Sequence, residues 1–272
     1  MSFFGHFIRI LASGLGLVGL VFFRLANLLN GLLPVILSPA QLTSLVRNHY
    51  LAAYSEKIVP QVLALGDDYL DPWEAEVLDR YKISSGRMLV LGSGWGRESI
   101  AIARRGIEVV GMDINYVATR TAQQLAKSAR LPARFHQADF LHPPYASASF
   151  DFVLLSSSMY SAIPGSSRRQ TWLADLGLLL KPDGFALLSF ESARVPDSRI
   201  KAFCVRLNAL SVKLPGANTS YQPGDYCVGG QFFHKFFTED EIRRELLGAG
   251  ASIQELNWAW GYTVVAFPPR LH

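Results

Sequence analysis

The sequence predicts an α/β fold in which an open, mostly parallel β-sheet is flanked by helices. Short apolar runs typical of buried strands alternate with segments of helical periodicity. A glycine-rich turn directly follows the first of these runs, Met88–Leu91. Two more runs, Ser252–Ala259 and Tyr262–Phe267, are joined at Trp260-Gly261 and predict a closing antiparallel hairpin. This alternation is the pattern of a sheet with crossover helices.

Composition limits the function classes. The chain has 272 residues, of which 50% are hydrophobic, and its length suits one large α/β domain with an appendage. The net charge is +4 and the pI about 9.1, without a Lys/Arg block, so we expect no nucleic-acid partner. An anionic membrane suits this charge equally well. The two cysteines do not make a disulfide framework, and the scattered histidines predict no metal site.

Residues 1–40 are predicted to form a hydrophobic, membrane-associating helix. Only Arg9 and Arg24 interrupt residues 3–37 with charge, and the uncharged run Ile10–Phe23 is shorter than the ~20 residues that a spanning helix needs. We therefore favour a helix that lies in the membrane interface or re-enters it. A single spanning helix, a cleaved signal peptide, and a helix packed on the domain or on a second copy are the alternatives.

Residues 41–85 are predicted to form a helical cover. Apolar and aromatic residues from Leu42 to Ala53 recur at helical spacing. The stretch Asp71-Pro72-Trp73-Glu74 has the signature of a helix start, with Asp as N-cap and Pro at the first helical position. Tyr50, Tyr54 and Trp73 are candidates for contact with a ligand, and core packing is the alternative for each.

The glycine-rich turn marks the predicted ligand site. Gly92, Gly94 and Gly96 alternate with Ser93 and Trp95, and a helical pattern begins at Arg97. Glycine permits a positive φ and lets a ligand approach the backbone beside the N–H groups of a helix N-terminus. A dinucleotide fingerprint places its third glycine three residues after the second, where this chain has Arg97. A plain structural turn is the remaining alternative.

Acidic residues follow the next two predicted strands. The strand Ile107–Met112 ends at Asp113, a place from which a carboxylate can bind both hydroxyls of a ribose. A helix N-cap or turn role is the alternative for Asp113. The third strand, Ala133–Gln137, is followed by Asp139-Phe140. An Asp beside an apolar ring suits a purine, which offers an amino donor and an apolar face. A loop Asp beside a core Phe is the alternative.

The second half of the sheet is predicted from three segments. Phe150–Leu155 is the fourth strand and runs into Ser156, at the point where ligands bind in open α/β sheets. A helix over Arg168–Leu180, a turn at Lys181–Gly184 and a fifth strand, Phe185–Phe190, follow. Thr238 and Glu241 form the capping box of the last helix.

In the order of these motifs, residues Trp73 to Phe267 resemble the class I S-adenosylmethionine-dependent methyltransferases. The resemblance implies a seven-stranded sheet of order 3-2-1-4-5-7-6 with an antiparallel last strand, and S-adenosyl-L-methionine as cofactor. It implies that Asp139 accepts a hydrogen bond from the adenine amino group while Phe140 packs on the ring. The cofactor-binding residues it implies are Gly92, Ser93, Gly94, Gly96, Asp113, Ile114, Asp139, Phe140 and Ser156.

One departure from the family concerns the amino group of the cofactor's methionine moiety. The family commonly has an acidic residue two positions before the first glycine, and this chain has Val90. Ser93, backbone carbonyl groups and Glu98 are the candidate substitutes. Tyr160 and His234 are weak candidates for orienting or deprotonating the methyl acceptor. The long connection 191–235 is predicted to be the acceptor lid within a methyltransferase domain of residues 86–272.

The sequence therefore predicts methyl transfer from S-adenosylmethionine to a small, hydrophobic or lipid-like acceptor. We expect the protein at the cytoplasmic face of a membrane, held through residues 1–40. An NAD-dependent oxidoreductase and a non-catalytic cofactor-binding module are the alternatives. The acceptor itself and the oligomeric state cannot be read from the sequence.

Overall fold

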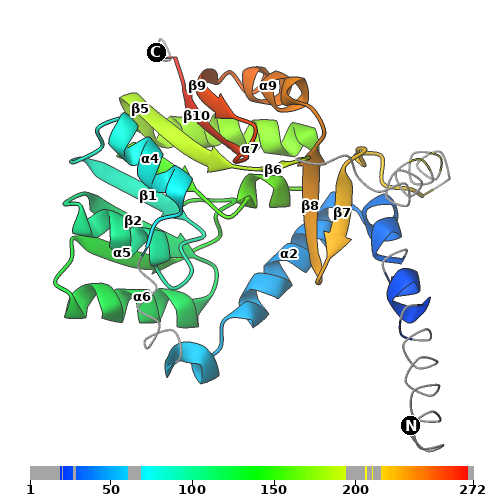
Figure 1. Ribbon diagram of the computed structural model, residues 1–272, viewed down its shortest axis with the longest axis horizontal. Coiled ribbons are helices and arrows are strands. Elements are labelled where there is room, and N and C mark those ends of the chain that lie inside the picture. Colours follow the sequence, from blue (N-terminus) through cyan, green and yellow to red (C-terminus); the bar gives the residue numbers. More distant parts are fainter. Residues whose placement is uncertain are drawn as a thin grey trace, which may run out of the picture.

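A computed structural model describes residues 19, 21–26, 29–60, 69–193, 206, 210 and 216–268. The main sheet has seven strands in the order β3-β2-β1-β4-β5-β10-β9 (Figure 1). Its strands are β1 (Arg87–Leu91), β2 (Glu108–Asp113), β3 (Ala133–Gln137), β4 (Phe150–Leu155), β5 (Leu180–Ser189), β9 (Ser252–Asn257) and β10 (Tyr262–Ala266). The first five are parallel, and β10 runs antiparallel to β5 and β9. The predicted fold class and strand order are confirmed.

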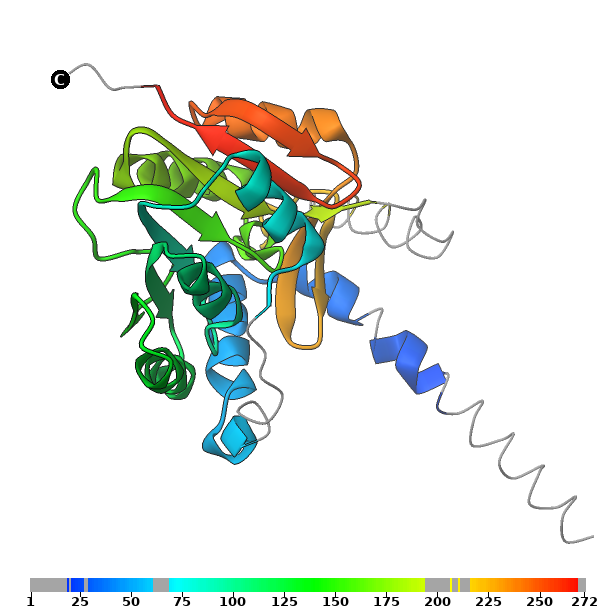
Figure 2. The ribbon, with the colours of Figure 1, turned by 60° about the vertical axis from the view of Figure 1, so that its left-hand side comes forward.

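Alternating residues of the strands build a core on each face of the sheet. Leu89 and Leu91 of β1 face one core, whereas Met88 and Val90 face the other. The first core receives α7 (Ser166–Leu179) and α9 (Glu239–Gly248). The second receives α4 (Pro72–Arg80), α5 (Arg97–Arg104) and α6 (Tyr116–Ser128). The sheet thus lies between two helical layers (Figure 2), and apolar side chains fill the space on both of its faces.

Local sequence signals set several element boundaries. The capping boxes of Asp71 with Glu74 and of Thr238 with Glu241 begin α4 and α9 as predicted. The third and fourth strands have the predicted bounds. The turn expected at Lys181–Gly184 is wrong, because β5 already begins at Leu180. The register between β5 and β4 shifts between Phe150 and Phe152 of β4. The Pro-Asp-Gly sequence of β5 lies at this irregularity, so the strand continues through it.

The predicted lid contains a second, smaller sheet, in which β8 (Gln231–Phe236) lies between β6 (Glu191–Ser192) and β7 (Asp225–Val228). The hairpin of β7 and β8 turns at Gly229-Gly230, where both φ angles are positive, at 58° and 77°. Two successive positive φ angles suit the tight hairpin turns that match strand twist, and glycine adopts them without strain. Residues 225–236 of the predicted lid thus form a hairpin. Residues 194–205, 207–209 and 211–215 lie outside the described residues.

Helix α2 (Pro39–Ala53) lies apart from the two helical layers and passes the carboxyl ends of the strands (Figures 1 and 2). Its buried residues Leu42 and Val46 pack with Ala162 and with Phe232 of the β7–β8 hairpin. The helix begins at a capping box formed by Ser38 and Gln41. One side of α2 contacts the small sheet, and another side faces the ends of the strands of the main sheet.

The N-terminal hydrophobic segment has two environments in its described part. Residues 21–26 and 29–36 are helical. Val35 is buried, and Asn218 binds the carbonyl oxygens of both Pro34 and Val35. The preceding apolar side chains are exposed: Val21, Phe22, Phe23, Leu25 and Leu29. Within the described residues, no helix is long and apolar enough to cross a membrane.

Candidate functional site

The glycine-rich turn connects β1 to α5 through three left-handed backbone positions. The φ angles of Gly92, Gly94 and Gly96 are 67°, 49° and 88°, a region that glycine adopts without strain. Two side chains lie directly against this turn. A Cβ atom on Gly94 would lie 2.8 Å from the Tyr54 hydroxyl oxygen, and one on Gly92 would clash with the sulfur of Met159. The glycines therefore have two roles. They permit the tight turn, and they let the side chains of Tyr54 and Met159 lie close to its backbone.

Asp113, at the end of β2, is bonded to this turn. Its Oδ2 accepts a hydrogen bond from the Gly94 N–H at 3.0 Å, and its Oδ1 accepts one from the Asn115 N–H at 2.8 Å. Burial raises the pKa of Asp113, although the backbone donors work in the opposite direction. A carboxylate has about four acceptor positions, so it can accept further hydrogen bonds from two hydroxyls.

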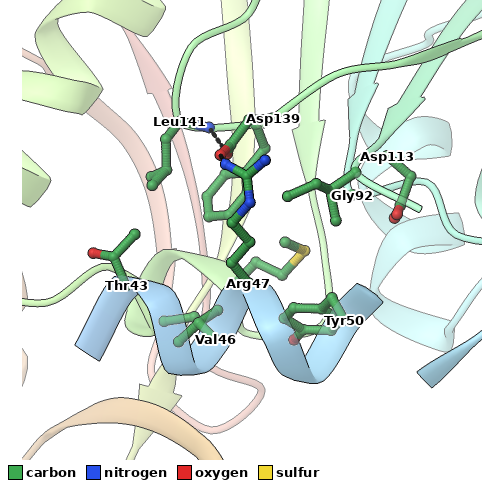
Figure 3. A pocket seen from close by; sticks show the side chains of 12 residues that line it. Thr43, Val46, Arg47, Tyr50, Gly92, Asp113, Asp139 and Leu141 are labelled. Carbon is green, nitrogen blue, oxygen red and sulfur yellow. Dashed lines mark hydrogen bonds and ion pairs between the residues drawn. The ribbon is translucent and has the colours of Figure 1, made fainter. Parts of the chain in front are cut away.

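Asp139 and Phe140 lie in the loop after β3, at the same edge of the sheet as Asp113. Asp139 Oδ1 accepts a hydrogen bond from the Leu141 N–H at 3.0 Å, and its Oδ2 lies 3.4 Å from Nη1 of Arg47 in α2 (Figure 3). The indole N–H of Trp172 donates to the Phe140 carbonyl oxygen at 3.0 Å, and the Trp172 ring contacts the Phe140 ring edge-on. These bonds hold the loop in one conformation beside α2.

A pocket lies between α2 and the strand ends (Figure 3). Residues proposed from the resemblance form one part of its lining: Gly92, Asp113, Ile114, Asp139 and Phe140. The rest of the lining is supplied by α2 and by apolar neighbours: Thr43, Val46, Arg47, Tyr50, Leu141, Met159 and Ala162. The pocket therefore combines two carboxylates with a largely apolar wall.

The other predicted cofactor residues lie beside this pocket without lining it. Gly94 donates to Asp113, while Gly96 packs against Ala122 and Phe135. Ser93 is buried, with its hydroxyl oxygen toward Gly111 of β2. Ser156, at the end of β4, binds the carboxylate of Glu98. These residues shape the turn, and their contact with a cofactor stays a prediction.

An ion cluster that the sequence did not reveal adjoins the glycine turn; we call Glu74, Arg97, Glu98 and Ser156 the Arg97 cluster. Arg97 Nη1 and Nη2 each donate to a Glu74 oxygen at 3.1 Å, and Nη2 also donates to Glu98 at 2.6 Å. Both carboxylates are buried. Burial raises the pKa of Glu74 to about 7, the charge of Glu98 adds to this rise, and Arg97 opposes it.

Strain marks the end of β4. Ser157 and Ser158 both have φ at 54°, which is uncommon for residues other than glycine and costs of the order of 1–3 kcal/mol each. The Ser158 N–H donates to Ser189 Oγ at 2.7 Å, which helps to hold this conformation. The chain then directs Met159 into the pocket lining. Such strain beside a ligand pocket is characteristic of functional loops.

Tyr160 and His234, the two weak catalytic candidates, lie outside the pocket lining. Tyr160 is buried, and its hydroxyl donates to Glu245 at 2.9 Å; burial, followed by the charge of Glu245, holds its pKa well above the ordinary value. His234 is also buried, with Nδ1 2.7 Å from an oxygen of Asp225. Their geometry is that of satisfied core groups.

Of the aromatic candidates in the helical cover, two face the pocket side and one does not. Tyr50 lines the pocket, and Tyr54 lies over Gly94. Trp73 stacks on Tyr262 with ring centroids 4.9 Å apart, inside the core. Arg47 and Thr43 were not predicted, although their spacing of three and seven residues before Tyr50 places all three on one helical face.

The sequence of the sheet's first half matches a known domain model. Residues 88–184 match the family described as "Methyltransferase domain". The putative methyltransferase YqeM of Bacillus subtilis is 31% identical over 118 residues, which is 42% of this chain and 47% of that protein. The match thus spans about half the length of this relative. Over residues 88–184 the sequence is therefore similar to methyltransferase domains.

Solved structures show the same fold. The 1,6-didemethyltoxoflavin-N1-methyltransferase of Burkholderia thailandensis, solved with its substrate and S-adenosylhomocysteine, has a TM-score of 0.59 and 18% identity, covering 84% of this chain and 89% of that chain. A SAM-dependent methyltransferase of Methanosarcina mazei has a TM-score of 0.51 and 21% identity, covering 73% and 98% of the respective chains. The architecture is that of class I methyltransferases.

Proposed function

We propose that this protein transfers a methyl group from S-adenosyl-L-methionine to a small, hydrophobic or lipid-like acceptor at the cytoplasmic face of a membrane. One observation carries the proposal: Asp113, Asp139 and Gly92 line the same pocket. In this proposal one carboxylate binds the ribose hydroxyls and the other binds the purine amino group, so the two carboxylates lie at opposite ends of the nucleoside. The methyltransferase model over residues 88–184 favours methyl transfer over the hydride transfer of an NAD-dependent enzyme.

The residues fit the cofactor by their chemistry. Asp113 has acceptor positions left for both ribose hydroxyls, and Asp139 has an oxygen directed to the pocket for the adenine amino group. Phe140 supplies an apolar surface for the ring. When bound, the cofactor supplies a methyl group activated on a sulfonium. The chain's contribution is to align the reactants and to exclude water.

The Arg97 cluster supplies the negative charge that Val90 does not. Val90 faces the same core as α4 and α5, and these two helices carry Glu74 and Glu98 near their N-termini. Glu98 reaches Ser156 at the end of β4, next to the first glycine of the turn. We therefore assign to Glu98 the role of receiving the ammonium group of the cofactor's methionine moiety.

The acceptor side of the pocket is apolar. Val46, Leu141, Met159 and Ala162 line it, and they suit a hydrophobic acceptor better than a charged one. Tyr50 is a hydrogen-bond donor here, because burial, with a further contribution from Asp113, raises the pKa of its hydroxyl. Tyr50 thus stays protonated at neutral pH and can orient an acceptor oxygen or nitrogen.

The exposed apolar side chains at residues 21–29 support membrane association. Phe22 and Phe23 are 66% and 64% exposed and directly precede the basic Arg24. Aromatic side chains beside an arginine suit the interface of an anionic bilayer, where the rings enter the acyl region and the guanidinium meets head groups. The helical segment is followed directly by α2, which covers the pocket. This continuity supports our proposal that the pocket lies near the bilayer.

Methyl transfer is tested with methyl-labelled S-adenosylmethionine. The protein is incubated with a membrane lipid extract and, separately, with a soluble extract, and labelled products are identified by mass spectrometry. The proposal expects label in a lipid-extract product. Label in soluble products alone would refute the lipid-like acceptor, and no label in either extract would favour a non-catalytic module.

Membrane association is tested by sedimentation with anionic vesicles. The full chain should bind, and the double variant Phe22→Glu/Phe23→Glu should lose at least tenfold in affinity. Leu247→Glu is the matched control, because Leu247 is an equally exposed apolar residue on α9. Equal binding by the wild type and the double variant would remove this segment as the contact surface.

A further inference from the structure

The side chain of Asn115 joins two helices at the edge of the pocket. Asn115 is buried and is the N-cap of α6, where its Oδ1 accepts a hydrogen bond from the Ala118 N–H at 3.1 Å. Its amide nitrogen is directed the other way, toward α2. It donates to the carbonyl oxygens of Tyr50 at 3.3 Å, Leu51 at 2.9 Å and Tyr54 at 3.2 Å. An ordinary N-cap uses only the first of these contacts.

These carbonyl groups lie where a helix leaves acceptors unsatisfied. The last four carbonyl oxygens of an α-helix have no partner within the helix, and α2 ends at Ala53. Asn115 meets this need from a distant part of the chain, since it is 61 to 65 residues away. The end of α2 is thus held by a long-range side-chain contact.

The same residue is bonded to the ribose-site carboxylate. The backbone N–H of Asn115 donates to Asp113, which also accepts from Gly94 in the glycine turn. Tyr50 lines the pocket, and Tyr54 lies over Gly94. Asn115 therefore connects the loop that would bind the cofactor with the two tyrosines that cover it.

The second polar contact between α2 and the strand ends is weaker. Arg47 and Asp139 are 3.4 Å apart, with side chains 55% and 24% exposed. Exposed ion pairs contribute about 0–1 kcal/mol. Moreover, the proposed adenine amino group needs Asp139, so the cofactor competes with Arg47 for it. The buried Asn115 contact is thus the one that can persist when the pocket is filled.

We propose that Asn115 is a positioning residue that fixes the end of α2 to the loop bearing Asp113, so that Tyr50 and Tyr54 stay closed over the bound cofactor. This inference rests on the proposed function. It assigns to Asn115 the retention of the cofactor, through α2, without contact with it. Loss of the amide donors therefore increases the rate at which the cofactor leaves.

The test uses Asn115→Ser, because serine retains an N-cap acceptor for α6 and lacks the amide donors. Thr238→Ala is the matched control, because it removes the cap of α9, which lies away from the pocket. We expect Asn115→Ser to raise the dissociation rate of S-adenosylhomocysteine about tenfold, as the loss of one net hydrogen bond predicts. Thr238→Ala should lower the melting temperature and leave this rate within twofold.

A second measurement needs no ligand. Hydrogen exchange of the α2 amides should be about tenfold faster in Asn115→Ser and unchanged in Thr238→Ala. Unchanged exchange in α2, or a dissociation rate within twofold of wild type, would overturn the inference. Failure of the wild type to bind S-adenosylhomocysteine would instead defeat the proposed function, and with it the role of Asn115 in cofactor retention, while the exchange data would still decide whether Asn115 holds α2.

Discussion

Two buried ion clusters in this protein differ in the balance of their charges. The Arg169 cluster consists of Tyr160, Arg169, Gln222 and Glu245. Arg169 binds Glu245 through two nitrogens at 2.6 and 2.8 Å, and its remaining nitrogen donates to the Ile163 carbonyl oxygen at 3.0 Å. Although burial opposes it, Arg169 holds the pKa of Glu245 below its ordinary value. In this cluster one cation, Arg169, pairs with one anion, Glu245, and other groups of the chain accept its remaining hydrogen bonds.

The Arg97 cluster has one arginine for two buried carboxylates, and the more exposed Asp71 lies 3.5 Å from the same guanidinium. Burial is the main cause of the raised pKa of Glu74, and the charge of the neighbouring Glu98 adds to the rise. The comparison teaches that a cluster whose charges balance needs no charged ligand and serves the stability of the fold. An unbalanced one beside a glycine turn can gain from a cationic ligand, and the proposed cofactor carries positive charge.

The largest effect is expected from Arg169→Leu. Removing the cation leaves Glu245 charged and buried, which costs about 3–5 kcal/mol of unfolding free energy. Urea denaturation measures this change. The double variant Arg169→Leu/Glu245→Leu should recover much of the loss, because it removes both charges. A loss below about 1 kcal/mol in the single variant would contradict the view that this cluster is structural.

The pH dependence of stability tests the Arg97 cluster. Because the pKa of Glu74 is about 7 in the folded protein and 4.5 as its ordinary value, the folded state holds a proton that the unfolded state releases between these pH values. The unfolding free energy should therefore fall as pH rises from about 4.5 to 7. Relative to Glu74→Gln, the fall should be about 2–4 kcal/mol. The groups that face Glu74 are Arg97, Glu98 and Asp71.

Parallel stability curves for the wild type and Glu74→Gln would contradict the excess of charge in this cluster. A further consequence concerns binding. A cation near Glu74 and Glu98 favours the ionised form of Glu74, so affinity for S-adenosylmethionine should rise between pH 6 and 8. Calorimetry in buffers of different ionisation enthalpy measures the accompanying proton release.

The smallest change in unfolding free energy is expected when Glu98 of the Arg97 cluster is replaced by Gln, and the same replacement of Glu245 in the Arg169 cluster is the comparison. Glu245→Gln should lower the unfolding free energy by about 2–4 kcal/mol, because it leaves Arg169 buried without its anion. Glu98→Gln should change it by less than about 1 kcal/mol, since a like charge is removed from beside Glu74. Instead, Glu98→Gln should weaken S-adenosylmethionine binding about tenfold, or 1.4 kcal/mol. The reverse assignment of effects would overturn the comparison.

Local signals were sufficient for much of the fold. The apolar runs, the capping boxes and the glycine turn predicted the strands, the starts of α4 and α9, and the place of the pocket. Asp113 was found because it ends the strand that follows the glycine turn. Asp139 was found through the resemblance to the class I methyltransferases. The turn predicted at Lys181–Gly184 is wrong because β5 begins at Leu180 and pairs with β4 on both sides of this sequence.

The missed site residues depend on contacts between distant segments. Glu74 looks like an ordinary first-turn acid of α4, and only the approach of Arg97, 23 residues later, shows that it is buried. Arg47 becomes a pocket residue because α2 lies across the strand ends. Tyr160 follows a strand that ends at the pocket, yet its hydroxyl is taken by Glu245, 85 residues away. No local pattern contains these pairings.

The central claim, that Asp113 and its pocket bind the adenosyl group, is tested most directly by titrating S-adenosylhomocysteine into the wild type and Asp113→Ala. Loss of two charge-assisted hydrogen bonds predicts an affinity about 100-fold weaker in the variant, with much of its stability retained. Saturable binding by the wild type with this loss is the expected result. Equal affinity of the two proteins, or no binding by the wild type, would contradict the account.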